Sequence, residues 1–100
     1  MASSWTYMLR CSDGSYYVGV TTHLDQRLGQ HQSGEFDGYT ARRRPVEMVW
    51  AEEFPSIDQA IGVERQLKGW SRLKKEALIR GDFNALPSLS KRGFRPSQAK

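Results

Sequence analysis

The stretch CSDGSYYVG, residues 11–19, decides how the first two extended segments of this chain pair. An Asp-Gly pair is a strong turn signal, and here it separates two segments rich in β-forming residues, WTYMLRC (5–11) and SYYVGV (15–20). We therefore expect an antiparallel hairpin. Because neighbouring side chains of a strand point to opposite faces, the adjacent Tyr16 and Tyr17 must serve different faces of the sheet.

The rest of the chain predicts one more strand and three helices, giving the order β-β-α-β-α-α. Thr22 can cap the first helix and Gly34 can end it, while Ser56 opens a capping box for the second helix. The expected ranges are 22–34, 56–69 and 71–80 for the helices and 46–54 for the third strand. The simplest architecture is an α+β fold (α/β in the broad sense), a short sheet flanked by helices.

The composition suits one small domain that binds a polyanion. The chain has 100 residues, with 15 basic and 11 acidic side chains and a net charge of +4. No run approaches the ~18 apolar residues that cross a membrane, and the start lacks the features of a signal peptide. A single cysteine fits a reducing compartment, so we expect a cytoplasmic protein without membrane contact. We assign residues 1–81 to the domain and 82–100 to a basic, mobile tail.

Polar residues interrupt the apolar stripe of the first helix. Leu24 and Leu28 share this stripe with Arg27 and His31, at the spacing i, i+3, i+4 and i+7. Charged residues often lie at the edge of such a stripe, with the arginine reaching water and the histidine bonded to a carbonyl group. The same pattern also fits a helix that borders a functional site.

The second helix shows a sharper anomaly. Ile57, Ala60, Ile61 and Leu67 share one face, and Glu64 projects into the middle of it. A buried carboxylate is costly unless it is paired or binds a metal ion. A salt bridge to the arginine of the first helix and a role as metal ligand or catalytic acid therefore both remain open.

Three segments together resemble the GIY-YIG nuclease domain, which the UvrC repair endonuclease shares. They are TYMLRCSDGSYYVG (6–19), RLGQH (27–31) and ERQLKGW (64–70). The second half of the signature is present as YVG, whereas the first half, WTY, keeps only its tyrosine. Ten positions separate Tyr7 from Tyr17 and ten more lead to Arg27. The resemblance covers about residues 4–80 and is closest to the small stand-alone bacterial members.

The resemblance implies a three-stranded antiparallel sheet and a metal-dependent endonuclease that hydrolyses phosphodiester bonds, in a structure-selective or repair-related role. It implies DNA rather than RNA as the partner and one divalent ion, Mg²⁺ or Mn²⁺. The implied catalytic residues are Tyr7, Tyr17, Arg27, His31 and Glu64, and Glu64 is the implied metal ligand. The alternative is a nucleic-acid-binding module that keeps the fold without catalysis.

Basic residues outside this set are expected to bind the nucleic acid. Arg42, Arg43 and Arg44 form a cluster suited to phosphate contacts, although a solvated turn would have the same composition. The resemblance covers no second DNA-binding domain, so affinity must come from basic residues of this domain. Lys74 and Lys75 are therefore expected to add to this surface.

The chemistry gives each tyrosine an expected role. We expect Tyr7 to orient or deprotonate the attacking water, with Tyr17 in support, although the sequence leaves open which tyrosine has which role. A phenol is a poor base with a pKa near 10, and Arg27, the metal ion and the second phenol are expected to lower the pKa of Tyr7.

If Tyr7 and Tyr17 belong to one site, their position also predicts the register of the hairpin. A two-residue turn at residues 13–14 would place Tyr7 and Tyr17 on opposite faces. A three-residue loop, 12–14, pairs Tyr7 with Gly19 and places both tyrosines on one face. We therefore predict the three-residue loop, with Gly19 leaving open space beside Tyr7 and with Tyr16 packing on the other face.

Overall fold

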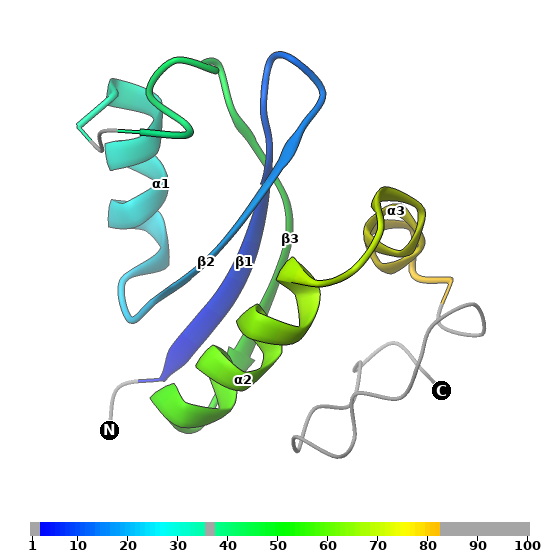
Figure 1. Ribbon diagram of the computed structural model, residues 1–100. Coiled ribbons are helices and arrows are strands. Elements are labelled where there is room, and N and C mark those ends of the chain that lie inside the picture. Colours follow the sequence, from blue (N-terminus) through cyan, green and yellow to red (C-terminus); the bar gives the residue numbers. More distant parts are fainter. Residues whose placement is uncertain (1–2, 36–37, 83–100) are drawn as a thin grey trace.

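The computed structural model describes residues 3–35 and 38–82, and it has the predicted order of elements (Figure 1). Most of the predicted tail, 82–100, lies outside the described residues. The elements are β1 (Ser4–Arg10), β2 (Tyr16–Thr21), α1 (Leu24–Ser33), β3 (Glu47–Phe54), α2 (Ile57–Lys68) and α3 (Arg72–Arg80). The strands form one antiparallel sheet in the order β2-β1-β3, which confirms the predicted α+β fold. None of the described helices is long and apolar enough to span a membrane.

The hairpin has the predicted three-residue loop. The Cys11 N–H donates to the Ser15 carbonyl at 2.8 Å, and the Gly14 N–H donates to the Cys11 carbonyl at 2.9 Å. Gly14 has a φ of 85°, a left-handed conformation that glycine adopts without steric cost. The resulting register pairs Tyr7 with Gly19, which confirms the prediction that Tyr7 and Tyr17 share a face.

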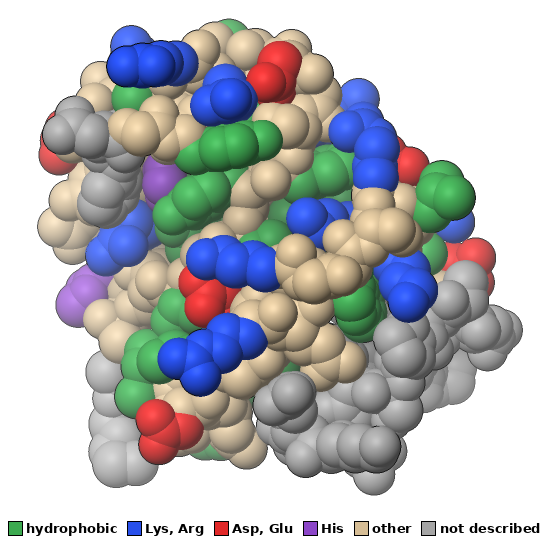
Figure 2. Space-filling model, in the orientation of Figure 1, with side chains coloured by type: hydrophobic (Ala, Val, Ile, Leu, Met, Phe, Trp, Pro, Cys, Tyr) green, Lys and Arg blue, Asp and Glu red, His purple; other side chains and the backbone are tan. Residues whose placement is uncertain are grey.

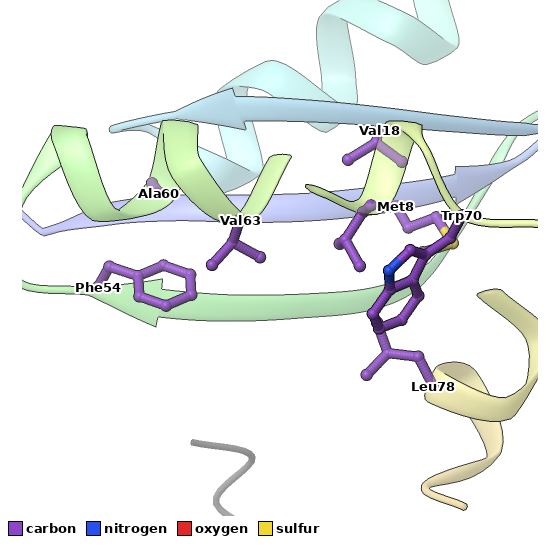
Figure 3. Packing of buried hydrophobic residues seen from close by; sticks show 8 residues of the cluster. Met8, Val18, Phe54, Ala60, Val63, Trp70 and Leu78 are labelled. Atoms are coloured by element: carbon purple, nitrogen blue, oxygen red, sulfur yellow. The ribbon is translucent and has the colours of Figure 1, made fainter. Parts of the chain in front are cut away.

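The two faces of the sheet have separate hydrophobic clusters, with α1 on one side of the strands and α2 and α3 on the other (Figure 1). The larger cluster lies on the side of α2 and α3 and contains Met8, Val18, Phe54, Ala60, Val63, Leu67, Trp70 and Leu78 (Figure 3). Tyr16 packs against this cluster and donates a 3.2 Å hydrogen bond to Glu76, so its predicted packing role is confirmed. The smaller cluster contains Tyr7, Leu9, Cys11 and Val46, with Leu24 and Leu28 of α1 packed on it.

Two local predictions about helices were wrong. The first helix begins at Leu24 with His23 as its N-cap residue. Thr22 does not cap it, because the Thr22 hydroxyl is bonded to His23 Nδ1 at 3.0 Å. On α2, Ile57 is 43% exposed, so the buried stripe has moved to Ala60, Val63 and Leu67 and leaves Glu64 beside it. The predicted cap at Ser56 is confirmed, since its hydroxyl accepts the Gln59 N–H at 3.3 Å.

The space expected beside Gly19 is occupied by Tyr7 itself. A Cβ atom at position 19 would lie 2.5 Å from the Tyr7 hydroxyl oxygen and 2.6 Å from Cζ. The prediction of open space for water and phosphate was therefore wrong at this point. Gly19 is needed because the Tyr7 ring lies directly against the backbone of β2.

Replacing Gly19 with Ala is expected to lower the free energy of unfolding by about 1–3 kcal/mol, because the new methyl group overpacks the Tyr7 ring. Gly29→Ala is the matched control, since a Cβ there meets nothing within 4 Å, and it should stabilise α1 by up to about 1 kcal/mol. Urea unfolding of both variants checks this. Equal stability of Gly19→Ala and wild type would contradict the packing described.

Candidate active site

Three aromatic rings from β1, β2 and α1 meet on the α1 side of the sheet. The ring centroids of Tyr7 and Tyr17 lie 6.4 Å apart, and His31 lies 5.8 Å from Tyr7 and 5.1 Å from Tyr17. Tyr7 and His31 are 1% and 2% exposed, whereas Tyr17 is only partly buried. The hairpin register and the four-residue spacing of Arg27 and His31 on α1 thus bring four sequence-predicted residues to one place.

A chain of hydrogen bonds joins these side chains. Tyr7 Oη and His31 Nε2 are 2.8 Å apart, and His31 Nδ1 lies 2.8 Å from the Thr40 hydroxyl. Arg27 also faces the Tyr7 hydroxyl as a donor, and its charge and hydrogen-bonding group act to lower the pKa of Tyr7. Since arginine can only donate, Tyr7 is assigned as the donor to His31 Nε2, and the His31 Nδ1–H is assigned as the donor to Thr40.

Thr40 is a site residue that the sequence analysis missed. It is 2% exposed and fixes the orientation of the His31 ring. It lies outside the helices and strands, where no periodic pattern predicts burial. A lone threonine in a polar segment carries no signal that could have identified it.

The pKa of Tyr7 moves in the direction opposite to the one expected. Burial, and then the charge of the neighbouring Tyr17, raise the pKa of Tyr7 from 10.0 to about 12, although Arg27 acts in the lowering direction. The expectation that the second phenol would lower this pKa was wrong, because a phenolate at Tyr17 would repel one at Tyr7. Tyr7 is therefore protonated at neutral pH.

The pKa of His31 is lowered, first by burial and second by the positive charge of Arg27. Neutral imidazole has one donor and one acceptor nitrogen, which matches the assigned bonds from Tyr7 and to Thr40. Protonation would place a second donor opposite the Tyr7 hydroxyl.

Protonation of His31 is expected to destabilise the fold as the pH falls. Because its folded pKa lies below the unfolded value, the unfolded state takes up the proton first, and stability is lost from about pH 6.5 down toward the folded pKa. The urea midpoint of wild type should therefore fall more steeply between about pH 7 and 5 than that of His31→Asn. His23→Asn, at an exposed histidine, should keep the wild-type slope. Equal slopes for all three proteins would contradict this.

Glu64 lies on α2, next to the buried stripe of that helix. Its side chain is 20% exposed and pairs with Lys68 Nζ at 3.0 Å, so the i,i+4 lysine, rather than Arg27, forms its salt bridge. Its negative charge is the smallest of the contributions that act on the pKa of Tyr7, and it acts in the raising direction. Within residues 3–35 and 38–82, no three His, Cys, Asp or Glu side chains are grouped to hold a metal ion. A lone carboxylate suits Mg²⁺, which keeps most of its waters.

A small open pocket reaches the site beside Arg27. It lies at the end of β2 and the start of α1, and all of its lining side chains are polar: Thr21, His23, Gln26, Arg27 and Gln30. Arg27 is therefore shared between the pocket and the bonded cluster around Tyr7. An anionic group that enters from solvent can reach its guanidinium.

The three arginines of the predicted cluster differ in their exposure and in their bonding partners. Arg42 is exposed. The Nε of Arg43 forms a 2.9 Å ion pair with Asp13, and Arg44 Nε donates to the Ala41 carbonyl at 3.0 Å. Arg43 thus ties the hairpin loop to the segment before β3. Binding of nucleic acid by these arginines stays a prediction.

The two lysines at the start of α3 differ from one another. Lys74 is exposed, whereas Lys75 is partly buried and burial lowers its pKa. Figure 2 shows Lys and Arg side chains spread over one face of the molecule, around a group of hydrophobic side chains with histidine beside them. Such a surface suits a polyanion, and contact by Lys74 and Lys75 stays a prediction.

Comparison with known proteins identifies the family. Residues 3–77 match the GIY-YIG catalytic domain. A UPF0213 protein of Natronomonas pharaonis is 41% identical over 78 residues, which are 78% of this chain and 92% of that protein. The solution NMR structure of a UPF0213 protein from Bacillus halodurans is 35% identical, with a TM-score of 0.52 and coverage of 95% of this chain and 97% of that chain. A protein from E. faecalis is 37% identical, with a TM-score of 0.58 and coverage of 88% and 93%. The chain therefore belongs to the GIY-YIG nuclease domain family and resembles its small stand-alone members.

Proposed function

We propose that this protein is a metal-dependent endonuclease that hydrolyses phosphodiester bonds in DNA. The observation that carries the proposal is the set of groups around the Tyr7 hydroxyl. His31 hydrogen-bonds to it at 2.8 Å, the Tyr17 ring lies 6.4 Å from the Tyr7 ring, and the positive charge of Arg27 acts on it from α1. Membership of the GIY-YIG family supports the reaction class.

Glu64 is the residue that would hold one Mg²⁺ or Mn²⁺. Its carboxylate is partly exposed and pairs with Lys68, whose side chain is exposed, so a hydrated cation can replace the lysine at low cost. When bound, such an ion acts as a Lewis acid on a phosphoryl oxygen and stabilises charge on the leaving oxygen.

Arg27 is suited to binding the scissile phosphate. Its guanidinium can bind two phosphate oxygens in a bidentate geometry that lysine cannot reproduce. The polar pocket at the start of α1 gives the phosphate a route to this side chain from solvent. The interaction of Arg27 with the Tyr7 hydroxyl keeps its guanidinium at the cluster before substrate binds.

The geometry favours Tyr17, rather than Tyr7, as the tyrosine that contacts the attacking water. The Tyr7 side chain is 1% exposed, its hydroxyl is bonded to His31, and burial holds its pKa at about 12. Tyr17 is only partly buried and lies 6.4 Å from Tyr7, between ring centroids. Tyr17 then orients or deprotonates the water, while Tyr7 keeps Arg27 and His31 in place.

The test is a cleavage assay on end-labelled DNA with Mg²⁺ or Mn²⁺ and with a chelator. Single-stranded, duplex, nicked and branched substrates test a structure-selective or repair-related role, and matched RNA tests the choice of DNA. The proposal expects cleavage that stops when the metal is removed. Salt-sensitive binding without cleavage of any substrate would instead support a non-catalytic nucleic-acid-binding module.

A further inference from the structure

Tyr39 is an exposed aromatic residue that extends the ring cluster toward solvent. We infer that Tyr39 binds an unpaired nucleobase next to the scissile phosphate. This role rests on the proposed nuclease function, because the position of the base is defined by the bond that is cut.

The Tyr39 ring stacks on Tyr17 without being covered by it. Their centroids lie 6.1 Å apart with an angle of 30° between the ring planes, whereas Tyr39 remains 40% exposed. A separation of 6.1 Å is larger than that of full face-to-face contact, so the rings are offset. The Arg43 guanidinium covers one face of the ring, so a further planar group can stack only where the offset leaves Tyr39 exposed, beside Tyr17.

Arg43 also holds Tyr39 in place, through its ring and through its backbone carbonyl. Its guanidinium carbon lies 3.9 Å from the centre of the Tyr39 ring, and Nη1 donates to the Tyr39 carbonyl at 2.9 Å. Its Nε is fixed in turn by Asp13 of the hairpin loop at 2.9 Å. Tyr39 is thus oriented before any ligand binds, which lowers the entropy lost on binding.

These surroundings favour a nucleobase over an apolar partner. A guanidinium, that of Arg43, lies over one face of the ring. The exposed part of the ring adjoins Tyr17, which contacts His31 near the positive charge of Arg27. Every base has a face that stacks on tyrosine, and such a stack changes affinity by about 10- to 100-fold. A base inside a duplex has both faces occupied by its neighbours, so the occupant must be unpaired.

The experiment measures binding of a short single strand that carries 2-aminopurine, using the full chain in a chelator so that cleavage cannot occur. We expect the fluorescence of 2-aminopurine to fall on binding. Tyr39→Leu should remove that fall and weaken binding about 10-fold or more, while Tyr39→Phe keeps both. Leu73→Ala, at another exposed apolar residue on α3, should behave as wild type.

Two outcomes would overturn the inference. Wild-type affinity and fluorescence in Tyr39→Leu would show that no base stacks there. An equal loss of affinity for single-stranded and duplex DNA would show that Tyr39 either supports the fold of the protein or contacts the sugar-phosphate backbone. Thermal unfolding of Tyr39→Leu and Tyr39→Phe separates these two causes. The stacking experiment does not depend on cleavage. If wild type shows no metal-dependent cleavage, the proposed function is overturned, but the stacking of a base on Tyr39 is not.

Discussion

Replacing Glu64 with Ala is expected to lower the cleavage rate by about 10³-fold or more, which corresponds to about 4 kcal/mol of transition-state stabilisation. The variant loses the carboxylate that is proposed to hold the divalent ion. DNA binding should stay within about twofold, because affinity depends mainly on contacts between basic residues and phosphates. Single-turnover cleavage and a binding titration on the same substrate check both parts.

Lys68→Ala is the matched control for this variant. It removes the 3.0 Å salt bridge to Glu64 but keeps the carboxylate, and the Lys68 side chain is 55% exposed. Exposed pairs of this kind contribute only about 0–1 kcal/mol, so its stability and cleavage should stay close to wild type. Equal losses in both variants would show that the salt bridge, rather than metal binding, explains the effect of Glu64→Ala.

Replacing Tyr17 with Phe is expected to lower the cleavage rate by about 10²-fold to 10³-fold with little change in DNA affinity or stability. The ring and its contacts with Tyr7, His31 and Tyr39 are kept, and only the hydroxyl group that is proposed to contact the water is lost. Rates measured over a range of substrate concentrations separate this effect on the rate constant from one on binding.

Tyr16→Phe provides an internal control at the neighbouring position. Tyr16 lies on the opposite face of β2, where its hydroxyl donates only to Glu76 at 3.2 Å. Its loss should cost at most about 1 kcal/mol of stability and leave the cleavage rate unchanged. Full activity of Tyr17→Phe, or equal losses in both variants, would contradict the assignment of the two tyrosines to different roles.

The hairpin could be predicted because a local turn signal and the site implied by the resemblance determine it together. The Asp13-Gly14 signal limited the loop to two lengths, and only one of them brings Tyr7 and Tyr17 to the same face. The fixed spacing of a helix then placed Arg27 and His31 side by side. Loop, register and shared face are all present in the structure.

What could not be predicted depends on contacts between distant segments. The burial of Thr40 and the stacking of Tyr39 both arise where the segment before β3 packs against the ring cluster. The raised pKa of Tyr7 results from burial by neighbours that a local pattern does not reveal. The stripe on α2 was misplaced because Ile57 is partly exposed, so apolar character alone did not indicate the buried face.

A crystal of the wild-type protein grown with Mn²⁺ tests the central claim most directly, through the anomalous signal of the ion. The proposed site predicts one strong peak at coordination distance, roughly 2.2 Å, from a Glu64 carboxylate oxygen, on the side facing Tyr7 and Arg27. It also predicts that the peak is lost in Glu64→Ala. A peak bound elsewhere in wild type, or one that persists in the variant, would contradict it.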